Sequence, residues 1–240
     1  MIMDIEVPYP SMGYDRAITI FSPEGRILQV EYAKRAAKSG STAIGLKAKD
    51  GVVIIADKRL PNKLIVGDSI EKIMLIDDHI ISTFAGYMAD GRVLMDVARE
   101  IAQQHRIDYG NKIDLLSLIR EVSNIMQYYT RYSGVRPFGI SLIIAGIDND
   151  NVPKLYSMDP SGIYYQYYAI AIGEGEDNIM KRLEEEYKPN ISIEEAIKFG
   201  IKLLKEALQD KFTIDRVIVG YIRVGEKPVI VEGKEIEKYL

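Results

Sequence analysis

Blocks of predicted β-strands alternate along this chain with pairs of predicted helices. Short turns such as Asp50-Gly51 join strands within a block, which indicates antiparallel hairpins rather than parallel βαβ units. The first block covers 41–48, 52–56, 71–76 and 79–84, and its helices cover about 88–106 and 115–130. The second block covers about 138–147, 153–158 and 163–172, and its helices cover about 176–187 and 192–208. Strands at 214–223 and 228–231 and a short C-terminal helix complete the pattern.

This order predicts an α+β protein built as a four-layer αββα sandwich, in which two mostly antiparallel sheets stack face to face and helices cover their outer faces. The apolar runs Val52–Ala56 and Ser141–Ile147 support it, because such runs are typical of strands that are buried on both faces. Two helix starts are also marked in the sequence. Asp114 is a predicted N-cap, and Ser192 with Glu195 forms a capping box.

No linker, low-complexity stretch or internal repeat interrupts the chain, so a single domain over residues 14–240 is predicted. Residues 1–13 contain prolines and a glycine without a periodic pattern and are interpreted as a flexible tail. An amphipathic helix follows at about 25–39. Its apolar positions are Ile27, Val30, Ala33, Ala36 and Ala37.

Composition excludes several kinds of site and partner. The absence of cysteine excludes disulfides, thiolate nucleophiles and thiolate metal sites, and the two histidines, His79 and His105, are not spaced as a metal-binding pair. A carboxylate-only metal site has no support either, so neither a metal nor a cofactor is expected. The net charge of −4 argues against nucleic acid as a partner.

The sequence also gives no sign of a membrane protein. No apolar run approaches the roughly 20 residues that cross a bilayer. The N-terminus lacks the basic flank and apolar core of a secretory signal. A cytoplasmic protein is therefore expected.

Three local patterns need an interpretation. Gly173-Glu174-Gly175 resembles the start of a dinucleotide fingerprint, but Asn178 occupies the third glycine position, which favours a tight strand-to-helix turn. The run Asp77-Asp78-His79 lies between two apolar strands, which favours a solvated hairpin turn over a metal or acid–base cluster. The tyrosine-rich run 164–168 fits an interface surface and a strand equally well.

Ser41 is the one serious catalytic candidate. A hydroxyl nucleophile can use its own α-amino group as base when it is the first residue of the mature chain. Here that requires cleavage after Gly40, with Asp57, Lys58 and Lys72 as surrounding charges. The segment before Ser41 is a well-patterned helix rather than a disposable tail, which argues against cleavage.

A set of motifs runs along most of residues 14–208. The segments are Tyr14–Arg26, Gln29–Ala33, Gly40–Gly45, Asp50–Val53, Ser69–Ile73, Ile76–His79, Ala89–Leu94, Gly134–Gly139, Asp159–Gly162 and Ala171–Gly173. Together, and in this order, they resemble the proteasome α-subunit family, particularly its archaeal members. The first segment and the Gly-Val-Arg-Pro-Phe-Gly segment are the most specific.

The resemblance implies the αββα fold of the N-terminal-nucleophile hydrolases and a non-catalytic role. In this family, α subunits form homo-heptameric outer rings on the β-subunit rings of a 20S core, whose β subunits degrade unfolded proteins. Two alternatives stay open: a self-processing hydrolase cleaved before Ser41, and an assembly scaffold without a gate.

Candidate site residues also follow from the resemblance alone. Residues that match the family's gate cluster are Tyr14, Asp15, Pro23 and Tyr32, for which ordinary turn and packing roles are the alternative. Residues that match the pocket for the C-terminal tails of a hexameric ATPase activator are Lys72, Gly40, Glu31 and Tyr87. Lys72 would meet the terminal carboxylate, although it also fits a strand lysine that faces solvent. Residues that match the pore annulus crossed by unfolded substrate are Tyr132, Ser133, Gly134 and Val135.

The sequence departs from the family at three places. Tyr87 replaces a leucine, Lys34-Arg35 replaces Arg-Glu, and Ser133 replaces a glycine. These changes bear on activator affinity and gate tightness and leave the fold prediction untouched.

Overall fold

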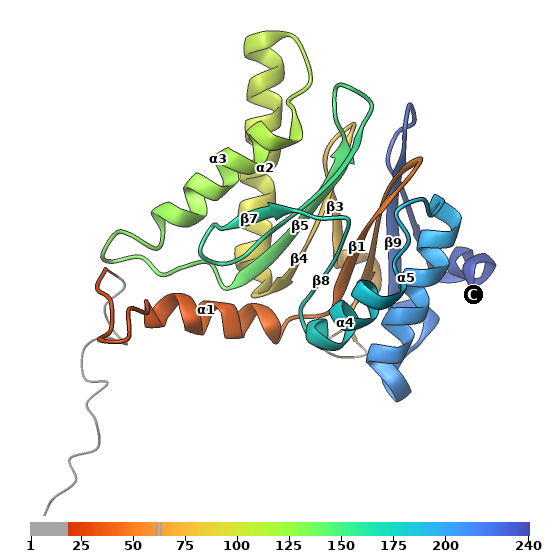
Figure 1. Ribbon diagram of the computed structural model, residues 1–240, viewed down its shortest axis with the longest axis horizontal. Helices are drawn as coiled ribbons and strands as arrows, with labels where there is room; N and C mark the ends of the chain where they lie inside the picture. The colour runs from red at the N-terminus through yellow and green to blue at the C-terminus, as the bar shows by residue number, and fades with distance from the viewer. Residues whose placement is uncertain (1–18, 61, 63) are drawn as a thin grey trace, which may run out of the picture.

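The computed structural model describes residues 19–60, 62 and 64–240. Two five-stranded antiparallel sheets stack face to face between layers of helices (Figure 1). Sheet A has the order β10-β9-β2-β1-β8, and its strands are β1 (Ala43–Ala48), β2 (Gly51–Asp57), β8 (Ala169–Ile172), β9 (Val217–Arg223) and β10 (Val229–Glu232). Sheet B has the order β3-β4-β5-β6-β7, and its strands are β3 (Ile73–Asp77), β4 (Ile80–Gly86), β5 (Ile140–Ile147), β6 (Pro153–Met158) and β7 (Tyr164–Gln166).

Helices cover the outer faces of both sheets. Helices α2 (Met88–Tyr109) and α3 (Leu115–Tyr128) pack on sheet B, whereas α4 (Glu176–Glu186) and α5 (Ile193–Leu208) pack on sheet A. Helix α1 (Leu28–Lys38) runs across one end of the sandwich (Figure 1). Short 3-10 segments are η1 (Gly67–Ser69), η2 (Gln209–Lys211), η3 (Ile214–Arg216) and η4 (Gly233–Tyr239). The predicted α+β, αββα fold class is confirmed.

The core explains why the central strands are so apolar. Along β5, Leu142 and Ile144 belong to the buried cluster under α2 and α3, whereas Ile143 and Ala145 belong to the cluster between the sheets. Successive side chains of a strand point to opposite faces, so a strand with helices on one face and a sheet on the other must be apolar throughout.

Both predicted helix starts are confirmed. The Asp114 Oδ1 atom accepts a hydrogen bond from the Ser117 amide at 2.9 Å. Ser192 and Glu195 form the reciprocal capping box at the start of α5. These side chains satisfy amides that have no partner within the first helical turn.

The single strand predicted at 163–172 is wrong, because the chain changes sheets within it. β7 pairs with β6 in sheet B, and β8 pairs with β1 in sheet A. The crossing occurs at Tyr167 and Tyr168, whose backbone atoms bond to Leu155 and Lys47 respectively. The tyrosine run has uniform strand propensity, so no turn residue marks the crossing in the sequence.

Three predicted boundaries also need correction. Helix α1 begins at Leu28 rather than near residue 25, because Gly25 has φ +74° in a preceding turn. The strand predicted to begin at 214 begins at Val217, and η3 occupies residues 214–216. Helix α2 extends past residue 106 to Tyr109, where Gly110 ends it in the left-handed conformation.

Candidate functional site

Helix α1 is anchored against the ends of the sheets. It contacts β4 and β5, and it buries Val30, Ala33 and Ala37. Ion pairs hold its exposed side: Lys34 lies 3.0 Å from Asp159, and Lys38 lies 3.0 Å from Glu176. The segment before the first sheet strand is therefore an integral part of the folded body.

Pro23 lies in an exposed turn that leads into α1. The Ser22 carbonyl accepts a hydrogen bond from the Gly25 amide at 2.8 Å, and the Ser22 amide donates to the Arg26 carbonyl at the same distance. Proline suits the second position of such a turn because its φ is already fixed. Tyr14 and Asp15, the other turn-side candidates, lie outside the described residues, as does the predicted tail.

Gly40 connects α1 to the first strand segment through a very tight contact. A Cβ atom on Gly40 would lie 1.9 Å from the Gly86 amide nitrogen, so only glycine fits there. The Gly40 carbonyl accepts a hydrogen bond from the Glu174 amide at 2.8 Å. The backbone on the N-terminal side of Ser41 is thus fixed between the ends of β4 and β8.

Lys72 lies under this contact and is only 2% exposed. Its Nζ atom donates hydrogen bonds to the carbonyls of Phe84 and, at 3.3 Å, Ser41. Burial lowers the pKa of Lys72 to about 7, against a smaller opposing effect of Asp57. The alternative of a solvent-facing strand lysine is wrong, because the β4 backbone and the segment after α1 enclose this side chain.

The other two charged candidates near Ser41, Asp57 and Lys58, each form an ion pair with a residue from elsewhere in the chain. Arg216 binds the buried Asp57 carboxylate through two nitrogens, at 2.9 and 2.7 Å. Lys58 pairs with Glu232 at 2.6 Å. The hydroxyl of Thr42 donates to the Glu174 carbonyl at 2.7 Å. These charged groups therefore already have partners within the fold.

A shallow cavity of about 320 Å³ opens beside α1. Tyr32 of α1 and Tyr87, which precedes α2, line it together with Arg136 and Pro137. The Arg136 guanidinium lies over the Tyr87 ring, 5.4 Å from its centroid. The structure therefore brings Tyr32 and Tyr87 together around one accessible surface.

Asp90 fixes the position of Arg136. Both Asp90 oxygens bind the guanidinium, and Oδ2 also accepts a hydrogen bond from the Gly139 amide at 2.8 Å. Burial alone would raise the pKa of Asp90, but these hydrogen bonds outweigh it, so its pKa is lower than usual. No role for Asp90 or Arg136 was predicted from the sequence, although both lie within motifs that carry the family resemblance.

The remaining candidates divide into separate groups. Glu31 lies on α1 and pairs with Arg26 at 3.3 Å, whereas its expected neighbour Lys72 is enclosed behind Gly40.

An exposed turn after α3 contains the four predicted annulus residues, Tyr132, Ser133, Gly134 and Val135. Gly134 in this turn has φ +87°. The Tyr132 ring stacks on Tyr128 with centroids 4.1 Å apart. Arg136 and Pro137, which follow this turn, line the cavity beside α1.

Two local interpretations have different outcomes. The tight turn at Gly173–Gly175 is confirmed, since both glycines have positive φ and the Glu176 carboxylate accepts from the Gly173 amide. The hairpin turn at Asp77–His79 is confirmed as a turn, but its predicted exposure to solvent holds only for Asp78. Asp77 and His79 are buried, and Arg106 of α2 binds Asp77 at 2.5 Å.

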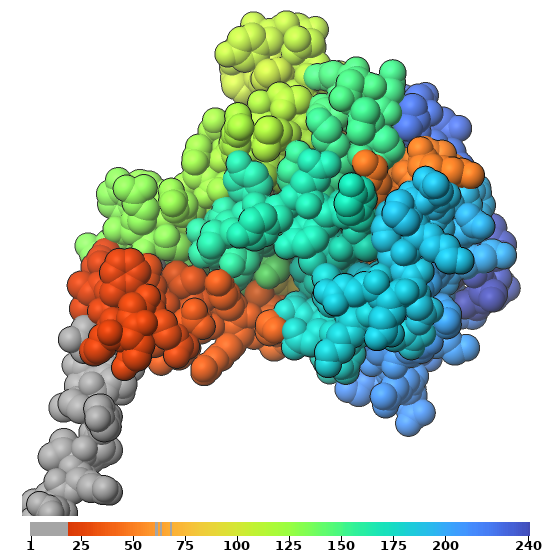
Figure 2. All heavy atoms as spheres, in the orientation of Figure 1, coloured from red at the N-terminus to blue at the C-terminus, as the bar shows by residue number. Residues whose placement is uncertain are grey.

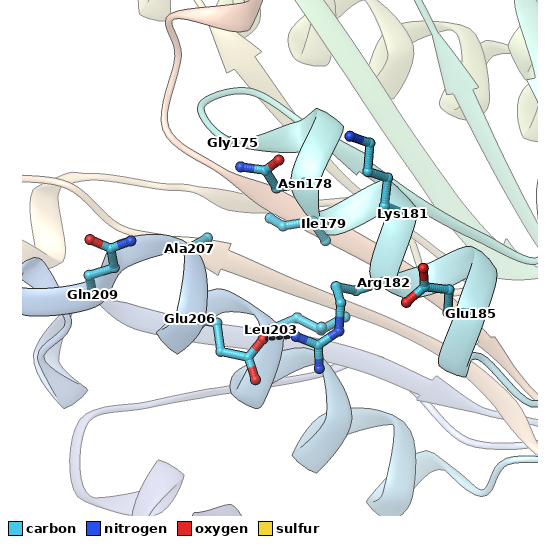
Figure 3. Close-up of a pocket in the computed structure, with 10 residues that line it drawn as sticks. All are labelled: Gly175, Asn178, Ile179, Lys181, Arg182, Glu185, Leu203, Glu206, Ala207 and Gln209. Atoms are coloured by element: carbon cyan, nitrogen blue, oxygen red, sulfur yellow. Dashed lines mark hydrogen bonds and ion pairs between the residues drawn. The ribbon is translucent and has the colours of Figure 1, made fainter.

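A second cavity, of about 410 Å³, lies between α4 and α5 (Figure 3). An ion pair of 2.6 Å between Arg182 and Glu206 spans it, as the dashed line in Figure 3 shows. None of the predicted site residues lines this cavity.

Across the described part of the chain, no cluster of three metal-binding side chains is present. Nor is any helix in that part long and apolar enough to cross a membrane.

Comparison with known proteins gives matches along nearly the whole chain. Residues 37–222 match the family described as "Proteasome subunit", and residues 14–36 match the N-terminal signature of A-type proteasome subunits. Similar proteins that are named as proteasome alpha subunits come from Picrophilus torridus and Archaeoglobus fulgidus, each 45% identical. Their alignments cover 95% and 96% of this chain and 97% and 94% of the relatives. A protein of the same name from Saccharolobus islandicus is 50% identical over 88% of both chains.

Proposed function

The chain belongs to the proteasome α-subunit family, and from that membership we propose that it is a non-catalytic subunit of a 20S core. In this proposal, copies of the chain form the outer heptameric ring, which stacks on a ring of proteasome β subunits. The α ring then controls the entry of unfolded protein, and the β subunits cleave it. Family membership supports a multi-subunit particle of α and β subunits.

One structural observation carries the non-catalytic assignment: α1 and Gly40 are packed into the sandwich immediately before Ser41. A free amine on Ser41 would require removal of a helix that buries Val30, Ala33 and Ala37 and forms ion pairs with Asp159 and Glu176. It would also break the Gly40–Glu174 hydrogen bond. The N-terminal signature matched over residues 14–36 lies wholly within the segment that processing would remove.

For gating, we propose that residues 1–13 cover the axial entrance of the ring. Fully extended, a tail of that length reaches about 45 Å, at roughly 3.3–3.6 Å per residue. Tyr14, Asp15, Pro23 and Tyr32 are proposed to hold neighbouring tails in the open state, and the turn at Tyr132–Val135 to form the annulus. The hydrogen-bonded turn around Pro23 supports this, because it fixes the start of the described chain next to α1.

For activator docking, we propose the surface around α1. The cavity at Tyr32 and Tyr87 supplies an accessible apolar floor for a peptide side chain. Lys72 supplies a buried amine whose hydrogen bonds, within the described part of the chain, go to carbonyls rather than to a carboxylate. A terminal carboxylate that reached it would stabilise the charged form of the amine. Because Lys72 is enclosed behind Gly40, docking there requires movement of the backbone around Gly40.

Reconstitution with a β subunit tests the catalytic assignment. We expect peptide hydrolysis only in the combined particle, with an unchanged rate when this chain carries Ser41→Ala. Loss of hydrolysis in the Ser41→Ala particle, with assembly intact, would favour the self-processing hydrolase instead.

A further inference from the structure

The two edges of the sandwich differ in chemistry. Strands β7 and β8 end their sheets on one side, and strands β3 and β10 end them on the other. The contacts between the sheets fix this pairing, because β1 and β8 pack over β6 and β5 while β9 packs over β3 and β4. Each edge therefore brings together the outermost strands of both sheets.

The first edge, here called the tyrosine edge, presents Ile163, Tyr165 and Tyr168. Tyr165 is 62% exposed, and its ring meets Tyr167 edge-on with centroids 6.4 Å apart. Tyr167 packs against the apolar cluster between the sheets, and Tyr165 lies outside it, in contact with Tyr167. The ammonium of Lys47 lies over the Tyr168 ring at 5.8 Å. In Figure 2 this teal segment lies uncovered on the face toward the viewer.

The opposite edge, here called the pocket edge, is hollow. A cavity of about 290 Å³ opens between β3 and β10, with Ile70, Leu75 and Ile230 among its lining residues. The Glu71 and Glu232 carboxylates also line it, and the Glu71 side chain is largely exposed. Leu75 is 46% exposed although it lies within a strand, which is costly unless another surface covers it.

The two edges complement each other. Exposed aromatic side chains on one edge match a cavity on the other that is lined by both apolar and charged side chains. The Glu71 and Glu232 carboxylates are paired with Arg99 and Lys58, which also line the cavity, and their remaining acceptor capacity can receive tyrosine hydroxyls. Tyrosine is also enriched among the residues that dominate protein–protein interfaces. Because both edges belong to one chain, the partner that fits each edge is a second copy of this chain.

We propose that the tyrosine edge of one copy docks on the pocket edge of the next, with Tyr165 entering the cavity lined by Leu75 and Ile230. A contact between two different surfaces is called heterologous, and it can repeat from one copy to the next. The repeated contact forms a closed ring when the rotation between neighbouring copies returns the last copy to the first. Burying two tyrosines supplies about 300–500 Å² per side. A stable interface needs about 800 Å² per partner, so neighbouring residues on both edges must contribute as well. This inference rests on the proposed ring and names the surfaces that build it.

Cysteine cross-linking tests the pairing, because the chain has no cysteine of its own. The full-length variants Tyr165→Cys and Leu75→Cys are prepared singly and together, and each is treated with a short bis-maleimide. We expect a ladder of covalent oligomers from the double variant, dimers from a mixture of the two single variants, and monomers from each single variant alone. Dimers from either single variant alone would show that like edges pair, which would overturn the proposal.

A control pair separates this proposal from the proposed function. Ile107 lies at the end of α2 and is exposed. The control double variant therefore carries Tyr165→Cys with Ile107→Cys in place of Leu75→Cys, and it should give no ladder of oligomers. Rings seen by native mass spectrometry, without the expected cross-link, would overturn the edge pairing and leave the proposed function standing. Failure of the wild-type chain to enter any ring with a β subunit would overturn both.

Substitution gives a second readout. Tyr165→Ala combined with Tyr168→Ala should raise the concentration for half-assembly by about tenfold or more. Tyr109→Ala is the matched control, because Tyr109 is 70% exposed but lies at the end of α2. An unchanged thermal melting profile of the monomer establishes that each variant folds. Equal assembly by the double variant and the wild type would overturn the proposal.

Discussion

Asp90 and Arg136 form a two-pronged ion pair, with 2.6 Å between Nη1 and Oδ2 and 2.7 Å between Nη2 and Oδ1. The pair joins the first turn of α2 to the loop that precedes β5. It thereby fixes the cavity wall at Tyr87 relative to the exposed turn at Tyr132–Val135. Its effect on stability is open to direct measurement.

Replacing Asp90 with asparagine should destabilise the fold. The amide side chain would keep the shape of the carboxylate but lose the charge that binds Arg136. Its NH₂ group is a donor, so it can pair with neither the guanidinium nor the Gly139 amide. We expect a loss of about 1–3 kcal/mol in the free energy of unfolding, measured by urea denaturation. Asp96→Asn, on the exposed side of the same helix, should cost less than about 0.5 kcal/mol. Equal effects of the two substitutions would contradict the structural role of Asp90.

Stability should fall in mild acid because of His79. Burial lowers the pKa of His79, opposed by its bond to the Ile113 carbonyl and by Asp77, while Lys112 and Arg106 lower it further. A histidine with a lowered folded pKa adds stability above its unfolded pKa of about 6.5, and this stability is lost as pH falls through the folded value. The urea midpoint should therefore decline as the pH falls below about 6.5.

His79→Gln is the variant that tests this assignment. The decline should be much shallower in His79→Gln and should persist in His105→Gln, which changes a histidine that bonds to Asn111 at the surface. If the urea midpoint of His79→Gln falls with pH as steeply as that of the wild type, groups other than His79 cause the acid sensitivity.

Lys72→Met should weaken stimulation by an ATPase activator without preventing ring assembly. Methionine fills similar apolar space but offers no charge to a terminal carboxylate, and a charge-assisted contact of this kind is worth on the order of tenfold in affinity. The measurement is peptide hydrolysis by the α–β particle at increasing activator concentration. Lys198→Met, on the exposed face of α5, is the control. A wild-type activation curve for Lys72→Met would exclude Lys72 from docking.

Deleting residues 2–12 should open the proposed entrance. Hydrolysis of a short fluorogenic peptide by the α–β particle should rise several-fold, because the segment proposed to cover the entrance is then missing. Saturating activator should add little to the rate of the deletion variant, although it accelerates the full-length particle. An unchanged basal rate after deletion would favour the assembly scaffold without a gate.

Local sequence patterns were sufficient to predict the layers of this fold. The apolar periodicity of residues 88–106 and the caps at Asp114 and Ser192 act within a few residues, so they can be read without a structure. The crossing at Tyr167–Tyr168 could not be predicted, because strand propensity continues across it and only the partners of β7 and β8 reveal the change of sheet.

The burial of the site residues was also hard to predict, because it depends on partners that lie far away in the sequence. Asp77 looked like part of a solvated turn until Arg106, which is 29 positions away, supplied its partner. Lys72 lies in a short polar stretch of sequence, and its enclosure depends on the carbonyls of Ser41 and Phe84. Arg136 was visible as part of a motif, but its pairing with Asp90 across 46 positions was not. Contacts between distant positions leave no local periodicity to read.

The intact mass of this chain, taken from a particle assembled with β subunits, decides whether the chain is a non-catalytic subunit or a processed hydrolase. We predict that residues 1–40 remain attached and that Ser41 keeps an ordinary peptide bond to Gly40. A mass that corresponds to a chain beginning at Ser41, together with peptide hydrolysis by that chain alone, would contradict the non-catalytic assignment.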